Sequence, residues 1–217
     1  MSLEWGSAPD WASAAANFIV AGAAAFAAYQ GWRGLSAWRS ETLGRRQMEL
    51  AEEALAGFYE ARDVYRWVRS PFSHSGEGSD REGRDSEAEF IRLHRDTFYV
   101  PLKRLADNKE FFGKLQARRY RVVASFGPAA EQPYIELGAV HSEIAAAAQA
   151  LMRIIPSALP ETTDLRLLRE RLERTIWHTA DDDEIGLRVA SSVAHAEELF
   201  RPVLTQSLTK KPEQRKS

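Results

Sequence analysis

Two histidine–glutamate pairs are the first candidates for chemistry, because helical bundles can hold a di-iron site. Such a site needs two Glu-x-x-His pairs, so that both ligands of each pair project from the same face of a helix. His141 with Glu143 and His195 with Glu197 are only two residues apart. On a helix that spacing separates the side chains by about 200°. The sequence therefore predicts no metal site.

Other catalytic signatures are also missing from the sequence. It has no GxxxxGK[ST] loop, GxSxG elbow or HExxH helix, and the fragment GEG at 76–78 has neither a preceding strand nor a lysine. The chain contains no cysteine, which excludes thiolate nucleophiles, disulfides and cysteine-held clusters. We therefore expect no cofactor.

One spacing does suggest an enzyme. Arg69 and His74 form an R-x4-H pair that resembles the motif of HEPN-type ribonucleases, helical-bundle proteins in which a dimer pairs such residues around an RNA phosphate. The resemblance implies catalytic roles for these two residues. Arg171 with His178 and Arg188 with His195 fit a looser R-x6-H spacing, as chance predicts when arginine is this common.

The stretch RSPFSHSGEGSDR at 69–81 is the most distinctive segment. A long helix ends there in a polar loop, and the loop carries Glu77 between two glycines. We predict that Arg69, Glu77 and Arg81 are binding residues that form an ion-pair latch or contact a phosphate. The alternative is a solvated loop tied to a helix end by weak surface ion pairs.

The elements that would position these residues are all helical. Apolar residues recur at helical spacing, and glycine and proline stand mainly at the breaks. Ser86 with Glu89 and Asp107 with Glu110 have capping-box spacing and are predicted to begin helices. After the first uncharged run, the sequence predicts about six helices, at 36–70, 86–105, 107–126, 132–155, 162–178 and 181–208.

Residues 11–32 carry no charged side chain, and a helix of this length measures about 33 Å, enough to cross a hydrocarbon core. Aromatic residues stand at both ends of the run. Arginines follow it and acidic residues precede it. This pattern predicts a single transmembrane helix in the inner (cytoplasmic) membrane, with the C-terminal domain in the cytoplasm.

A second interpretation of the same run stays open. The run is mostly alanine and contains Asn17 and Gln30, with Phe18, Ile19, Val20 and Phe26 as its strongly apolar residues. A buried, Ala-rich first helix of a soluble bundle has a similar composition. Its small residues, at 21/25 and 24/28, would also let two helices approach closely, so we expect self-association or pairing with another protein.

The chain resembles a group of uncharacterised bacterial membrane-anchored helical proteins. The resemblance is carried by this first run, the region around Trp38 and the segment EEALAGFYEARDVYRWVRSPF. The likeness extends over most of the chain. It implies a membrane anchor followed by a helical domain, and it implies no activity.

These observations give an all-α chain with three parts, which are residues 1–35 as tail and anchor, 36–208 as a helical bundle and 209–217 as a basic disordered tail. A net charge of −2 argues against dedicated nucleic-acid binding. We interpret the protein as an interaction or scaffolding module without chemistry of its own, and a membrane-tethered HEPN-like ribonuclease or other effector is the alternative.

Overall fold

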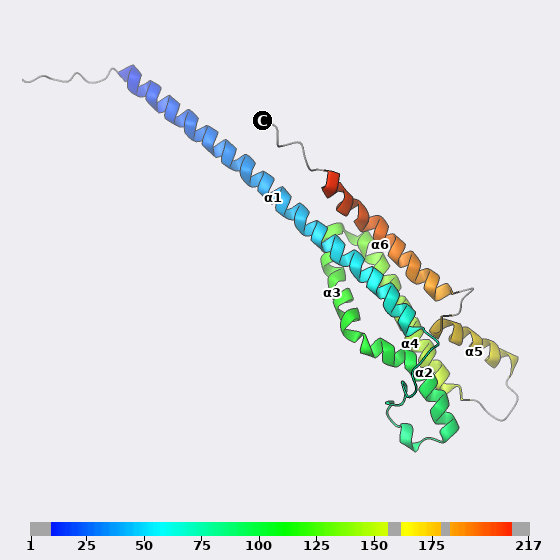
Figure 1. Cartoon of the computed structure of the whole chain (residues 1–217). Coiled ribbons are helices and arrows are strands. Elements are labelled where there is room, and N and C mark those ends of the chain that lie inside the picture. The colour runs from blue at the N-terminus through cyan, green and yellow to red at the C-terminus, as the bar shows by residue number, and fades with distance from the viewer. Residues whose placement is uncertain (1–9, 156–161, 179–182, 210–217) are drawn as a thin grey trace, which may run out of the picture. The chain divides into compact units, whose positions relative to one another are not determined.

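The computed structural model describes residues 10–155, 162–178 and 183–209, and every regular element in these ranges is a helix (Figure 1). The all-α prediction is therefore confirmed. Two short 3₁₀ helices, η1 (Arg84–Ser86) and η2 (Pro128–Glu131), accompany the α-helices. The α-helices are α1 (Asp10–Val68), α2 (Glu89–Asp107), α3 (Lys109–Phe126), α4 (Gln132–Arg153), α5 (Thr163–Ile176) and α6 (Glu184–Thr209).

The chain divides into two compact units, residues 1–47 and residues 48–217. Helix α1 runs without interruption through residues 35 and 36, where the sequence predicts a boundary between the first run and a second helix. In the first unit the strongly apolar side chains of α1 are exposed, with fractions of 80% at Phe18, 72% at Ile19, 67% at Val20 and 63% at Phe26. The predicted basic tail falls largely on residues 210–217, which lie outside the described residues.

The predicted membrane anchor needs correction. Within the described ranges no helix is long and apolar enough to cross a membrane. The prediction of an inner-membrane location is therefore wrong, and the transmembrane helix predicted at residues 11–32 is not supported. Membrane contact through these residues stays a prediction. The physical reason lies in composition, because alanine contributes little hydrophobic free energy and Asn17 and Gln30 interrupt the run.

The core of the second unit forms around α4. This helix is rich in alanine, and its buried stripe includes Leu137, Val140, Ile144 and Leu151. The second half of α1 lies along it, where Phe58 meets Tyr134 edge to face with ring centroids 4.7 Å apart. Tyr65 Oη donates a hydrogen bond to the Leu137 carbonyl at 2.8 Å, which satisfies a buried hydroxyl.

Helix α6 packs antiparallel to the second half of α1, as Figure 1 shows. At one end Arg69 of the segment after α1 pairs with Asp183, just before α6, and near the middle of α6 Tyr59 donates to Glu197. Ser192 of α6 donates to Glu136 of α4 at 3.0 Å, so α6 is tied to both helices. The polar residues after α1 are thereby held against the beginning of α6.

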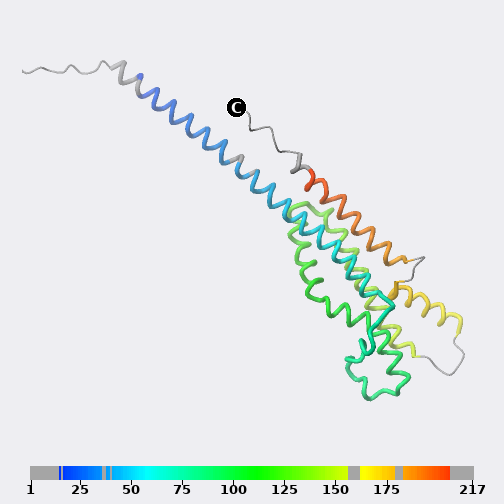
Figure 2. The backbone as a smooth tube through the Cα atoms, in the orientation of Figure 1, coloured from blue at the N-terminus to red at the C-terminus, as the bar shows by residue number. Residues whose placement is uncertain are grey.

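The chain leaves α1 through a loop of residues 69–83 before η1 and α2, which Figure 2 lets the reader follow. The capping box predicted at Ser86 and Glu89 is wrong, because Ser86 Oγ donates to the Gly83 carbonyl. Ala88 occupies the N-cap position before α2 begins at Glu89, and no side chain caps this end of the helix. Asp107 caps no helix either, since it belongs to α2 and Asn108 precedes α3. The end of α3 at Gly127 is as predicted, and its φ of 88° explains why glycine is needed there.

Candidate functional site

Arg69 closes the C-terminal end of α5. Its Nε donates to the Thr175 carbonyl at 2.9 Å, and its Nη2 donates to the carbonyls of Arg174 at 2.9 Å and Trp177 at 3.1 Å. Those carbonyls belong to the last turn of a helix, where acceptors lack partners within the helix. The side chain is 3% exposed, so Arg69 satisfies these acceptors in a nearly dry environment.

Asp183 neutralises Arg69. Its two carboxylate oxygens accept from Arg69 at 2.6 and 2.8 Å, and Oδ1 also accepts from the Gly186 backbone N–H at 3.0 Å. The second contact makes Asp183 the N-cap of α6. Burial alone would raise the pKa of Asp183, but the hydrogen bonds from Arg69, Gly186 and His178 outweigh it and lower the pKa. The carboxylate is therefore held ionised.

Arg104 on α2 is the centre of a second cluster, and Glu77 is its counter-ion. Its Nε and Nη2 meet the two Glu77 oxygens at 2.6 and 2.8 Å, a bidentate pair. The guanidinium also lies 4.3 Å from the Trp67 ring centroid. Only 1% of the side chain is exposed, so this pair is buried at the Arg104 end.

The backbone completes the coordination of Arg104. Its Nη1 donates to the carbonyls of Trp67 at 3.0 Å and Ser70 at 2.8 Å, and its Nη2 donates to that of Phe72 at 2.8 Å. These carbonyls follow one another through the end of α1 and the start of the loop. Arg104 and Glu77 therefore fix the path of the chain where it leaves α1.

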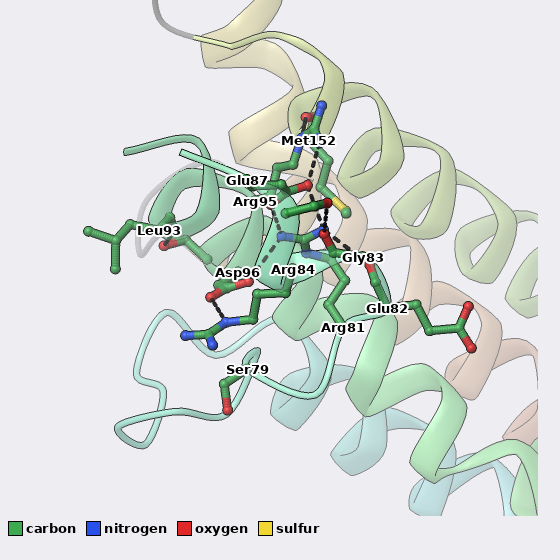
Figure 3. Close-up of polar contacts among 12 residues, drawn as sticks. Ser79, Arg81, Glu82, Gly83, Arg84, Glu87, Leu93, Arg95, Asp96 and Met152 are labelled. Atoms are coloured by element: carbon green, nitrogen blue, oxygen red, sulfur yellow. Dashed lines mark hydrogen bonds and ion pairs between the residues drawn. The ribbon is translucent and has the colours of Figure 1, made fainter. Parts of the chain in front are cut away.

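Arg81 belongs to a third cluster, which Figure 3 shows in close-up. It bonds both oxygens of Glu87 and lies 3.3 Å from Asp96. Arg84 and Arg95 add further ion pairs, to Asp96 at 2.8 Å and to Glu87 respectively. Hydrogen bonds from Arg81 first, and then from Arg95, lower the pKa of Glu87 to about 2. Three cations thus share two carboxylates and hold the end of the loop against α2.

The three residues predicted to bind, Arg69, Glu77 and Arg81, therefore lie in three separate clusters, each with partners of its own. Arg69 and His74 do not converge. The Arg69 guanidinium lies against α5 and Asp183, whereas the His74 ring lies beside Trp67 with ring centroids 6.4 Å apart. The arrangement of arginine and histidine that a ribonuclease would need is not formed by this pair.

Sequence reasoning missed the partners Arg104, Asp96 and Asp183 because they are distant in the chain. The position of Arg104 in the sequence does indicate a buried role. It falls on the apolar stripe of α2, next to Leu105 and three residues after the buried Pro101. A charged residue on a stripe that packs into the core implies a buried counter-ion.

A cavity of about 340 Å³ opens beside the Arg69 cluster, between α1 and the beginning of α6. His178 lies at its edge, and its Nδ1 is 2.6 Å from Asp183 Oδ2. A second cavity, of about 380 Å³, is lined by Tyr65, Phe112 and His141 among others, and burial lowers the pKa of His141. In the part of the chain that the structure describes, no three metal-ligating side chains gather into a metal site.

Comparison with models of known protein families, with curated proteins and with solved structures found no match. The resemblance to bacterial membrane-anchored helical proteins thus stays a prediction from the sequence, and its implied anchor is corrected above.

Proposed function

We propose that the protein is an assembly module whose first helix pairs with the first helix of a second copy. The observation that carries the proposal is the exposure of Phe18, Trp32 and Leu35 on α1, at 80%, 77% and 49%. The proposal keeps the expected interaction role and makes no use of a membrane.

An exposed helix of this kind gains stability by packing. Most of the stability of helices in proteins comes from the burial of an apolar face, because isolated helices are marginal. Removing one large apolar side chain from water contributes about 1.5–3 kcal/mol. Trp32 is 77% exposed and Leu35 is 49% exposed, so burying these side chains in an interface would contribute hydrophobic free energy.

The apolar and small residues of this segment form a seam with alternating spacings of three and four. That spacing is the signature of helices that wind around each other. Three alanines in the middle of the seam allow the two backbones to approach closely, as small residues do at other helix interfaces. The seam consists of Phe18, Ala21, Ala25, Ala28, Trp32 and Leu35.

A second copy of the chain fits this seam well when the two helices run antiparallel. Phe18 of one copy then faces Ala28 of the other, so that this large side chain meets a small one, and Ala21 faces Ala25, where the two backbones can approach closely. Residues 11–32 carry no charged side chain, so no like charges oppose the pairing.

Sedimentation velocity of the full-length protein tests the proposal, with a single charge placed in the seam. We expect a dimer for the wild-type protein and a monomer for Ala25→Glu, because the new carboxylate would be buried opposite an alanine without a partner. The matched control is Ala27→Glu. Ala27 lies two residues after Ala25 and does not belong to the seam, so this variant should sediment as a dimer.

Two results would contradict the proposal. One is a wild-type protein that stays monomeric at high micromolar concentration. The other is equal dissociation by Ala25→Glu and Ala27→Glu, which would show that added charge matters and the seam does not. Circular dichroism of each variant would establish that the helical content is unchanged.

A further inference from the structure

The cavity between α1 and α6 combines charge with an apolar wall. From α1 it is lined by residues at helical spacing, Arg62, Tyr65, Arg66 and the adjoining Arg69, so that one face of two helical turns points into it. From α6 come Gly186, Leu187, Val189 and Ala190. Its volume of about 340 Å³ is in the range of small-molecule sites.

Two arginines in this cavity have guanidinium N–H groups that can donate hydrogen bonds to a ligand. Arg66 is exposed, and among the described residues it makes no hydrogen bond or ion pair. Arg62 has an ion pair with its neighbour Asp63 at 3.3 Å, and both side chains are well exposed. An exposed pair of this kind contributes little, so a ligand can compete for Arg62.

His178 is held in a defined orientation at the edge of the same cavity. Asp183 accepts from its Nδ1 at 2.6 Å, and this carboxylate is already neutralised by Arg69. The remaining ring nitrogen, Nε2, is then available to a ligand and becomes a donor when the ring is protonated. Asp183 therefore orients a third group without adding a net negative charge to the cavity.

The rest of the lining is apolar. Tyr65 and Val189 are buried, and Leu187 is 71% exposed at the rim. A simple inorganic ion would leave this surface uncovered. A ligand with an apolar or aromatic body would cover it and gain free energy in proportion to the area buried.

We infer that this cavity binds a small phosphate monoester whose organic part is apolar. The phosphate dianion matches the two arginines, which bind phosphate oxygens through paired N–H donors. His178 Nε2 adds a third contact when the ring is protonated, and the organic part lies against Leu187 and Val189. The inference does not depend on the pairing of the first helices, since every residue involved lies in the second unit.

Isothermal titration calorimetry of the full-length protein with phenyl phosphate tests the inference. We expect saturable binding to the wild-type protein and at least about 10-fold weaker binding to Arg66→Gln, which loses a charge-assisted contact. The matched control is Arg166→Gln, because Arg166 is an exposed arginine on α5 outside the cavity. It should bind phenyl phosphate like the wild-type protein.

Two further probes separate the parts of the inference. Inorganic phosphate should bind more weakly than phenyl phosphate because it covers no apolar surface, and benzoate should bind more weakly because it carries a single negative charge. Absence of phenyl phosphate binding at millimolar concentration, or equal weakening by Arg66→Gln and Arg166→Gln, would overturn the site. Equal affinity for benzoate would overturn the assignment to phosphate, and equal affinity for inorganic phosphate would overturn the role of the apolar wall.

Discussion

Glu77→Gln removes the carboxylate that neutralises the buried guanidinium of Arg104. Loss of one partner of a buried ion pair costs about 3–5 kcal/mol, because the remaining charge stays buried. Glutamine keeps one acceptor oxygen, and the carbonyls of Trp67, Ser70 and Phe72 still accept from Arg104 at 2.8 to 3.0 Å. We therefore expect the lower end of the range, a loss of about 3 kcal/mol in the free energy of unfolding.

Urea denaturation followed by circular dichroism at neutral pH would measure this loss. The matched control is Glu82→Gln, since Glu82 is an exposed glutamate in the same loop. That variant should stay within about 0.5 kcal/mol of the wild-type protein. A Glu77→Gln variant as stable as Glu82→Gln would refute the conclusion that the pair holds the loop to α2.

The pH dependence gives the same experiment a second readout. The Arg104 hydrogen bond is the main cause of a pKa of Glu77 below its usual 4.5. A group whose pKa is lowered by folding stabilises the folded state above its unfolded pKa, and this contribution disappears as the pH falls through the folded pKa. The difference in stability between wild type and Glu77→Gln should therefore be largest at neutral pH and shrink below about pH 4.5. A difference that stays constant with pH would contradict the ionic origin of the effect.

Three further predictions concern single sites. Gly78→Ala should destabilise the protein by about 1–3 kcal/mol in urea denaturation, because its Cβ would lie 2.1 Å from the Asp96 carbonyl oxygen. The control Gly113→Ala should be neutral or stabilising, because a Cβ at Gly113 would have no atom within 4 Å. Tyr65→Phe should cost about 1 kcal/mol by the same assay, since it removes the buried hydrogen bond to Leu137, and no measurable loss would contradict that bond. In an NMR titration the Glu87 carboxyl should titrate at about 2, and a midpoint near 4.5 would contradict the shared pairing with Arg81 and Arg95.

Local sequence patterns predicted most of the fold. The helices expected at 107–126, 132–155 and 162–178 correspond to α3, α4 and α5, because each has its own apolar stripe and a clear stop such as Gly127 or Pro156. The start of α2 was placed too early, since Ser86 bonds to Gly83 instead of capping a helix. Spacing alone does not tell which of two acceptable local hydrogen bonds a serine forms.

The candidate site was only partly predictable. Arg69, Glu77 and Arg81 are involved in ion pairs, but Glu77 finds its partner 27 residues away at Arg104, and Arg69 finds its partner 114 residues away at Asp183. Contacts at such separations depend on how α1, α2 and α6 pack, which no local pattern encodes. The cavity beside Arg66 is likewise formed by two helices far apart in the sequence.

Disulfide cross-linking of the first helix tests the proposed assembly most directly, because the native chain has no cysteine to interfere. Ala21→Cys and Ala25→Cys proteins would be mixed, oxidised and examined by non-reducing electrophoresis. The antiparallel seam predicts a covalent dimer in the mixture, little dimer from either protein alone and none from Ala27→Cys. No dimer in the mixture, or an equal yield from Ala27→Cys, would contradict the pairing of two copies along this seam.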